Sequence, residues 1–192
     1  MRTIDEEKKA RVTRAVLALV SSEGIQGLTF SKIAAQAGVS SGTPFVYYRD
    51  KADMLAKIYV AVKDEINAGL AVAITKGQTI QAQLRLAALY MAKMALKYPL
   101  EWQYIEAVES NPGAVSDQAR AQFRQVVTPL RQLYAQAIAA DLLVTADPDD
   151  IHVLLFAPMK ALLTRKQVNH QTVTLADLQT IIDLSLAGLI KS

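Results

Sequence analysis

A short run of small and hydroxylated residues, "SSGT" at positions 40–43, stands directly before a proline and a cluster of aromatic side chains. Hydroxyl groups donate and accept hydrogen bonds, and small side chains let the backbone approach another surface closely. At the start of a helix, such residues suit contact with base edges in the major groove of DNA, which is about 12 Å wide. The same residues also cap ordinary helices, so the elements around them must be considered.

These elements have the order helix, helix, tight turn, helix. Thr3 and Glu6 have the spacing of a capping box and open a first helix, which the sequence "EGIQG" ends at Gly24. Ser31 is placed to cap a short second helix, "KIAAQA", which ends at Gly38. The sequence therefore predicts a helix-turn-helix arrangement within the first 50 residues.

Pro44 indicates where the third helix begins. Proline in a helix interior costs about 3 kcal/mol, but in the first turn its missing N–H has no intrahelical partner to lose. We therefore expect this helix to begin at Ser40 or Ser41 and to be short.

The remaining chain reads as further helices, with no convincing strand pattern, and predicts an all-α protein of about nine helices. Pro129 predicts a kink or break within its helix. Asp147 with Pro148, and Thr174 with Asp177, are strong helix starts. The expected later helices begin near Asp50, Thr79, Pro99, Val115, Asp147 and Thr174, and the first of them runs to about Ile74.

The last two of these helices, the eighth and ninth, are apolar around most of their circumference. Two explanations stay open: they form the core of a monomer, or they build an intersubunit bundle in a homodimer. Within the eighth helix, Pro158 frees the carbonyl of Leu154, which predicts a kink.

Charge is distributed unevenly along the 192 residues. Residues 1–57 contain nine Lys or Arg and six Asp or Glu, giving 9 − 6 = +3, whereas residues 58–192 contain twelve of each, giving zero. A local positive excess favours a polyanionic partner, although a difference of three charges alone can also arise by chance.

Several classes of function lack support in the sequence. There is no cysteine, no Gly-rich phosphate loop, no nucleophile elbow and no cluster of His and carboxylates at ligand spacing, so neither an enzyme, a metal site nor a cofactor is expected. His152 and His170 read as structural or exposed. No apolar run approaches the roughly 18 residues of a membrane span, and the N-terminus lacks a secretory pattern, so a cytoplasmic location is expected.

The stretch "LTFSKIAAQAGVSSGTPFVYYRDKADML" resembles the DNA-binding region of the TetR family of transcriptional regulators. The resemblance covers residues 8–57 in detail, and the later helices agree with that family's C-terminal domain in architecture alone. It implies a DNA-binding domain over residues 1–50 and a ligand-binding and dimerisation domain over 51–192. The matching positions are Thr29, Ile33, Ala34, Gly38, Val39, Ser40, Gly42, Phe45, Tyr47, Tyr48 and Lys51.

The resemblance also implies roles for individual residues. Contacts to base edges or close approach to them fall to the turn and the third helix, and contacts to phosphate fall to the flanking positions. Phe45 stands where a tyrosine is frequent, so the hydroxyl contact to phosphate is lost and at most a van der Waals contact with sugar or phosphate is expected there. Tyr48, Ile33, Ala34 and Val39 are implied to be core. The implied DNA-binding residues are Thr29, Lys32, Ser40, Ser41, Gly42, Thr43, Phe45, Val46, Tyr47 and Lys51.

A palindromic operator, a homodimer formed through the eighth and ninth helices, and release by a small-molecule effector are further implications of the resemblance. Helix four would link the two domains as a lever. Trp102 and Glu106, four residues apart, could hold a polar or cationic ligand, whereas each candidate could also be ordinary core. The candidates for an effector site are Tyr90, Met94, Trp102, Glu106, Phe123, Tyr134 and Phe156.

Two alternatives stay open for the DNA-bound function. The protein could activate transcription in place of repressing it, or it could be an architectural protein that binds DNA without sensing a ligand. Specific and nonspecific binding differ in sequence preference and in salt dependence, because nonspecific binding rests almost wholly on phosphate contacts.

Overall fold

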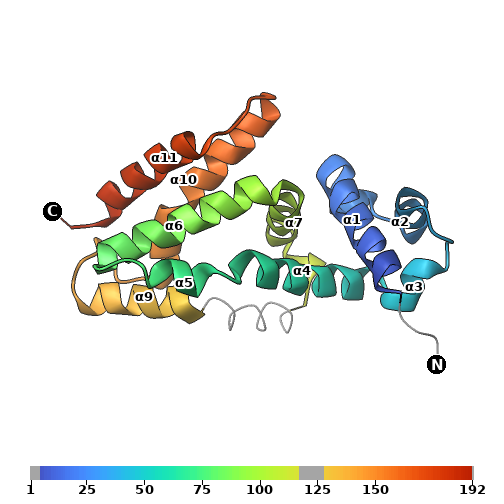
Figure 1. Ribbon diagram of the computed structural model, residues 1–192, viewed down its shortest axis with the longest axis horizontal. Coiled ribbons are helices and arrows are strands. Elements are labelled where there is room, and N and C mark those ends of the chain that lie inside the picture. Colours follow the sequence, from blue (N-terminus) through green and yellow to red (C-terminus); the bar gives the residue numbers. More distant parts are fainter. Residues whose placement is uncertain (1–4, 117–127, 192) are drawn as a thin grey trace. The chain divides into compact units, whose positions relative to one another are not determined.

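The computed structural model describes residues 5–116 and 128–191, and in these ranges the chain is helical, with one isolated antiparallel bridge between Leu143 and Ile190. The prediction of an all-α protein is confirmed. None of the helices in the two described ranges is long and apolar enough to cross a membrane. The chain divides into two compact units, which Figure 1 draws with their helices labelled.

Unit 1 contains the described residues of Met1–Glu65 and Tyr98–Gln125. Its first three helices, α1 to α3, are called the head. Within the head, α2 and α3 pack against α1, and α7 also packs against α1. The helices of unit 1 are α1 (Glu6–Glu23), α2 (Phe30–Ala37), α3 (Thr43–Tyr47), most of α4 (Lys51–Asn67) and α7 (Pro99–Glu109), with 3-10 turns at Ile25–Gly27 and Pro112–Ala114.

Unit 2 contains the described residues of Ile66–Lys97 and Val126–Ser192. Within it, α10 and α11 lie side by side, and α6 contacts both α5 and α11 (Figure 1). Its helices are α5 (Leu70–Ile74), α6 (Ile80–Lys97), α9 (Thr128–Ala139), α10 (Pro148–Val168) and α11 (Leu175–Leu189). The predicted domain boundary at residue 50 concerns function and stays a prediction.

The helix starts agree with the sequence in unit 2 and differ from it in the head. Asp147 caps α10, and Thr174 forms the predicted capping box with Asp177. The cap of α1 is Asp5, whose carboxylate accepts from the Lys8 amide, while Thr3 lies outside the described residues. Ser31 is not the cap of α2 as predicted: Thr29 accepts from the Lys32 amide at 3.3 Å. Thr29 has extended backbone angles, as a cap requires.

The long helix predicted from Asp50 to Ile74 is interrupted at Ala68 and Gly69, between α4 and α5. The cause is a side chain from α6. The hydroxyl of Tyr90 donates to the Ile66 carbonyl at 2.8 Å and accepts from the Gly69 amide at 2.9 Å. A Cβ on Gly69 would lie 3.0 Å from the Tyr90 ring, so glycine allows this close approach. Tyr90 thus supplies the hydrogen bonds that the broken helix lacks.

Pro129 and Pro158 both lie within helices of unit 2, and the kinks predicted at them stay predictions. Pro129 is the second residue of α9, and the part of the predicted helix before Thr128 lies outside the described residues, apart from Val115 and Ser116. Helix α10 continues through Pro158, and both Pro158 and Leu154 lie on its exposed side. A carbonyl released on that side can be hydrated, which removes the need for a partner inside the protein.

Polar contacts, one of them fully buried, join α7 to other parts of unit 1. Tyr104 is fully buried and donates a hydrogen bond to the Leu55 carbonyl of α4 at 2.8 Å. Lys63 of α4 contacts Glu109 of α7 at 2.5 Å, and Ser21 of α1 donates to Gln103. The compact unit that contains the head therefore also includes α7, although α3 ends at Tyr47 and α7 begins only at Pro99.

Candidate nucleic-acid interface

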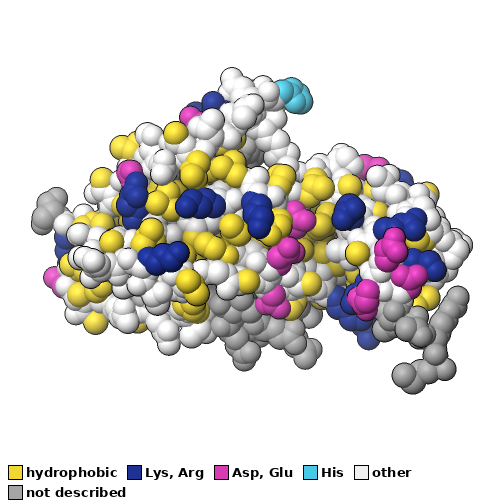
Figure 2. Space-filling model, viewed as in Figure 1, with side chains coloured by type: hydrophobic (Ala, Val, Ile, Leu, Met, Phe, Trp, Pro, Cys, Tyr) yellow, Lys and Arg dark blue, Asp and Glu magenta, His cyan; other side chains and the backbone are white. Residues whose placement is uncertain are grey.

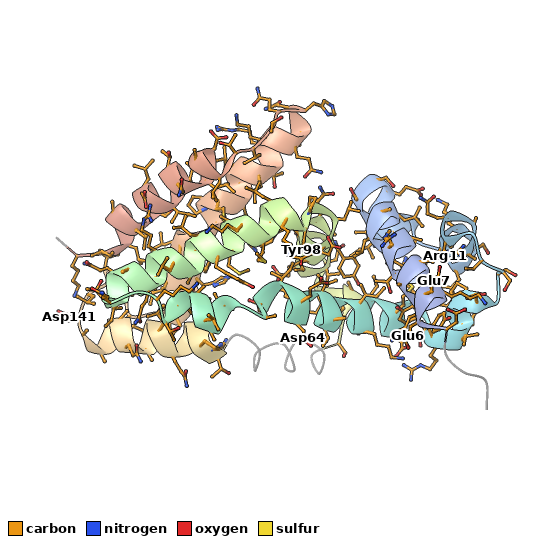
Figure 3. The ribbon with its side chains drawn as sticks, viewed as in Figure 1. Glu6, Glu7, Arg11, Asp64, Tyr98 and Asp141 are labelled. Atoms are coloured by element: carbon orange, nitrogen blue, oxygen red, sulfur yellow. The ribbon has the colours of Figure 1, made fainter. Side chains whose placement is uncertain are left out.

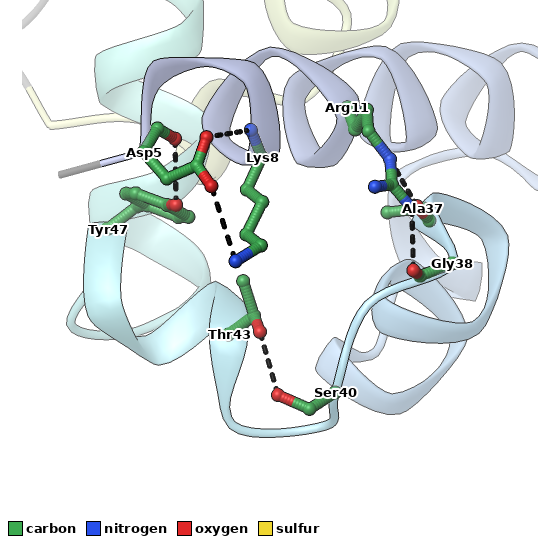
Figure 4. A network of polar contacts seen from close by, with 8 residues as sticks. All are labelled: Asp5, Lys8, Arg11, Ala37, Gly38, Ser40, Thr43 and Tyr47. Carbon is green, nitrogen blue, oxygen red and sulfur yellow. Dashed lines mark hydrogen bonds and ion pairs between the residues drawn. The ribbon is translucent and has the colours of Figure 1, made fainter.

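The turn between α2 and α3 is held from outside by Arg11 of α1 (Figure 4). The guanidinium donates to the Ala37 carbonyl from Nε at 3.0 Å and from Nη2 at 2.5 Å, and Nη2 also donates to the Gly38 carbonyl at 2.6 Å. These carbonyls end α2 and have no helical partner, so a cation there satisfies them and matches the helix dipole. Sequence reasoning did not identify Arg11, because its partners are backbone atoms 26 and 27 residues away.

Gly38 is required at this turn for two reasons. Its φ of 61° lies in the left-handed region, where side chains are disfavoured. A Cβ at this position would also lie 2.8 Å from Nη2 of Arg11. The sequence identified Gly38 as the end of α2, and the structure adds that Arg11 occupies the space a side chain would need.

Helix α3 begins later than predicted. Ser40, Ser41 and Gly42 form the turn, and the Thr43 amide donates to the Ser40 carbonyl at 2.9 Å. The two hydroxyls of Ser40 and Thr43 also lie 2.8 Å apart and hydrogen-bond to each other (Figure 4). The helix runs from Thr43 to Tyr47 with buried Pro44 in its first turn, so the short length is as predicted but the start is not.

The aromatic residues of the head divide into anchors and exposed groups. Tyr48 is 3% exposed and shares a hydrogen bond with Thr13 of α1 at 3.1 Å, as expected for an anchor. Burial raises the pKa of Tyr48, so its hydroxyl stays neutral. The Tyr47 hydroxyl donates to the Asp5 carbonyl at 3.0 Å (Figure 4). The two tyrosines together tie the end of α3 to α1.

Phe45 and Val46 are the large exposed side chains of α3, at 60% and 55% exposure. The Phe45 ring meets the Phe30 ring of α2 edge to face, with centroids 4.3 Å apart. Phe45 is thereby held in place on one side and open on the other. Ile33 and Ala34 are buried as expected, whereas Val39, expected in the core, is only half-buried.

Cations near α3 are largely engaged by neighbouring carboxylates. Lys32 contacts Glu23 at 2.5 Å, Arg49 contacts Asp50 at 3.0 Å and Lys57 contacts Asp53 at 2.9 Å. The pKa of Asp53 is lowered below its ordinary value of 3.8, and the hydrogen bond from Lys57 is the main cause. Figure 2 shows basic and acidic side chains interleaved over this end of unit 1.

Two further cations, Arg14 of the head and Lys51 at the start of α4, differ from these. Among the described residues, no carboxylate lies at ion-pair distance from Arg14 or Lys51. These two side chains can meet a phosphate without first leaving a partner. All ten DNA-binding candidates lie between Thr29 and Lys51 of unit 1; Thr43, Tyr47 and Lys51 are half-buried and the other seven are exposed.

The effector-site candidates are spread over both units. Trp102, which is buried, and Glu106 lie on α7 of unit 1, and Phe123 lies outside the described residues. Tyr90, Met94, Tyr134 and Phe156 belong to unit 2, where Tyr90 holds the α4–α5 break described above.

The structure brings Tyr134 and Phe156 together through His152. The Tyr134 hydroxyl lies 3.3 Å from Nδ1 of His152, and the imidazole stands 4.8 Å from the Phe156 ring, centroid to centroid. His152 itself is exposed, in line with its expected structural or exposed role. Within the described ranges, no three His, Asp or Glu side chains are grouped as metal ligands.

The fold and this geometry define an all-helical protein with an N-terminal helix-turn-helix. Residues 12–58 match the model of the family described as bacterial regulatory proteins, tetR family. A segment of 65 residues is 34% identical to YxbF of Bacillus subtilis (strain 168), an uncharacterised HTH-type transcriptional regulator. That match covers 34% of this chain and 17% of the relative, so the chain spans about a sixth of the relative's length.

Solved structures are similar over the whole chain. A TetR family transcription regulator from Marinobacter aquaeolei VT8 has a TM-score of 0.86 at 19% identity and covers 100% of both chains. The regulator FadR from Bacillus subtilis, solved in complex with stearoyl-CoA, has a TM-score of 0.72 at 18% identity, over 94% of this chain and 98% of its own. At these identities the likeness shows the fold. Residues 12–58 thus match the DNA-binding segment of the tetR family of bacterial regulatory proteins, and the chain as a whole has the fold of solved TetR-family regulators.

Proposed function

We propose that this regulator is a homodimeric repressor that binds a palindromic DNA operator and releases it when a small molecule binds. The observation that carries the DNA part is the head itself: a clamped turn after α2 presents Phe45 and Val46 of α3 outward, within the segment that matches the family. Such a geometry suits insertion of α3 into a major groove.

Phosphate contacts are proposed on both sides of α3. Lys51 is available as it stands, whereas Lys32 must exchange Glu23 for a phosphate. Thr29 and Tyr47 already use their hydroxyl groups as acceptor and donor within the protein, and each retains hydrogen-bonding capacity for a phosphate oxygen. Ser40, Ser41, Gly42 and Thr43 are proposed to approach base edges.

The dimer is proposed to form through α10 and α11. On α10, Val153 and Leu154 are 57% and 42% exposed, and on α11 Leu184 is 65% exposed. Exposed residues of α11 recur at the spacing of one helix face, which also contains Ala187 and Gly188. Gly188 has open space where a Cβ would stand, so a second helix can approach closely there. Two heads in a dimer would read two half-sites.

Effector binding is proposed to shift the protein between DNA-competent and DNA-incompetent states. A ligand can do this only if it binds the second state more tightly. Helix α4 carries the chain from the head into unit 2 and is the proposed lever. Because FadR of Bacillus subtilis was solved with stearoyl-CoA, long-chain acyl-CoA thioesters are a reasonable first class of probe. A location in the cytoplasm, and no enzymatic activity, go with this role.

Trp102 and Glu106 are kept as candidates for the effector site. Trp102→Ala is expected to reduce release by the effector and to leave operator affinity unchanged. Loss of both properties would assign Trp102 to the core of unit 1, where α7 packs against α1.

The experiment that tests the proposed function selects bound sequences from a random duplex library and then screens small molecules for release of the selected site. We expect a palindrome with half-sites about one helical turn, or a multiple of it, apart. If no sequence is enriched and binding falls steeply with salt for every duplex alike, the protein is an architectural DNA-binding protein instead.

A further inference from the structure

The surface that α3 presents is chemically unusual for a base-reading element. Residues 38–48 contain no Arg, Lys, Asn, Gln, Asp or Glu, which are the side chains that make specific paired hydrogen bonds to base edges. The hydroxyls of Ser40 and Thr43 are bonded to each other. The large side chains that α3 exposes to solvent are apolar, namely Phe45 and Val46.

The two side chains are also fixed in position. Phe30 packs edge to face against the Phe45 ring, and the clamp of Arg11 on the preceding turn holds the start of α3. Tyr47, the next residue, is bonded to the Asp5 carbonyl at the start of α1. Because these three contacts already fix the position of α3 and of the Phe45 ring, little conformational freedom is lost when this apolar surface binds a partner.

The apolar group that B-DNA presents in its major groove is the C5-methyl of thymine. We propose that Val46 and Phe45 determine operator specificity by contacting thymine methyl groups, so that each half-site carries thymine where α3 reads it. This inference rests on the proposed function, since it requires α3 to enter the groove. It goes further by naming the chemical group that is read and the residues that read it.

The test uses the full-length protein and a duplex chosen by random-library selection. Each thymine is replaced in turn by deoxyuridine, which removes only the methyl group, and the affinity is measured at fixed salt. We expect about three- to five-fold weaker binding at one or two thymines per half-site, the effect of losing one buried methyl contact. Uniform affinity across all the deoxyuridine duplexes, with tight binding of the parent duplex, would overturn the inference and leave the proposed function standing.

Variants then assign the contact. In Val46→Ala or Phe45→Ala, the loss caused by deoxyuridine should disappear at the thymine that the side chain touches. Both side chains are exposed, so the head should still fold, which circular dichroism checks. Val72→Ala, which truncates an exposed valine of unit 2, is the matched control and should keep the full deoxyuridine effect. An unchanged effect in both α3 variants would overturn the assignment, and selection of no duplex at all would overturn it together with the proposed function.

Discussion

The head and the α10–α11 pair treat their surface groups in opposite ways. In the head, bonds within unit 1 occupy the side chains of Arg11, Tyr47, Tyr48 and Lys32. Its large exposed apolar residues, Phe45 and Val46, both lie on the five-residue helix α3. In α10 and α11, large apolar residues are exposed on both helices, namely Val153 and Leu154 on α10 and Leu184 on α11. Several polar side chains of the head are thus already bonded within unit 1, whereas α10 and α11 leave apolar residues exposed that a second chain can cover.

The comparison also concerns how the two regions are stabilised. The turn of the head depends on directional contacts that a single atom can disturb. The helix pair depends on buried apolar area, which tolerates change in shape but not the introduction of charge. Variants of the head should therefore change its stability, whereas charged variants of the helix pair should change dimerisation.

The largest effect is expected for Leu184→Glu on α11. A carboxylate buried without a partner in the proposed interface should weaken dimerisation by about 100-fold or more, and operator affinity should fall with it. Sedimentation velocity measures the first effect and a fluorescence-anisotropy titration the second. Val72→Glu is the matched control, because Val72 is 62% exposed on α5 and Leu184 is 65% exposed on α11. If both variants dimerise like the parent, the interface lies elsewhere.

Gly38→Ala should be the most disruptive change in the head. The left-handed backbone costs a side chain roughly 1–2 kcal/mol, and displacement of Arg11 adds to this. We expect the free energy of unfolding of unit 1 to fall by about 2 kcal/mol, measured by urea denaturation. Gly42→Ala is the control, because its φ is −80° and no atom lies within 4 Å of the added Cβ. Equal effects of the two variants would contradict the clamp.

Arg11→Lys tests the geometry of the clamp and retains its charge. A lysine cannot reproduce the fork that reaches two carbonyls, so about 1–2 kcal/mol of stability should be lost. Arg14→Lys, on the same helix, should have no measurable effect, since no carboxylate among the described residues pairs with Arg14. Full stability of Arg11→Lys would show that charge alone holds the turn.

A smaller effect is expected for Glu23→Gln, which frees Lys32. An exposed ion pair is worth about 0–1 kcal/mol, so operator affinity should rise by at most about five-fold. Glu7→Gln changes the net charge equally on the exposed first turn of α1 (Figure 3) and controls for long-range electrostatics. An identical gain in both variants would show that Lys32 does not exchange Glu23 for phosphate.

The smallest effect concerns acid stability. Backbone and side-chain hydrogen bonds lower the pKa values of Asp50 and Asp53 below 3.8 at the start of α4. Their contribution to stability is therefore complete above pH 3.8 and is lost as the pH falls through the folded-state values. The stability difference between parent and Asp53→Asn should shrink in that window.

Local sequence patterns predicted much of this molecule. Gly38 and the "IAAQAGVS" string established the order of α2, turn and α3, and Asp147 and Thr174 marked the starts of α10 and α11. Each of these signals acts within a few residues of chain, so it can be read without a tertiary structure. The buried anchor Tyr48 followed from the family resemblance.

Features that depend on distant contacts escaped prediction. The break before α5 depends on Tyr90, which lies 21 residues from Gly69, and helical periodicity continues across it. The clamp of Arg11 depends on carbonyls 26 and 27 residues away. The cap at Thr29 in place of Ser31, and the start of α3 at Thr43, are shifts of two or three residues that depend on backbone angles within equally polar sequence.

Competition binding between a selected duplex and a shuffled duplex of equal length tests the central claim most directly. Both should be measured with the full-length protein at one salt concentration near the physiological value. The account predicts that the selected palindrome binds at least roughly 10³-fold more tightly than the shuffled duplex. Equal affinity of the two duplexes would contradict a sequence-reading regulator.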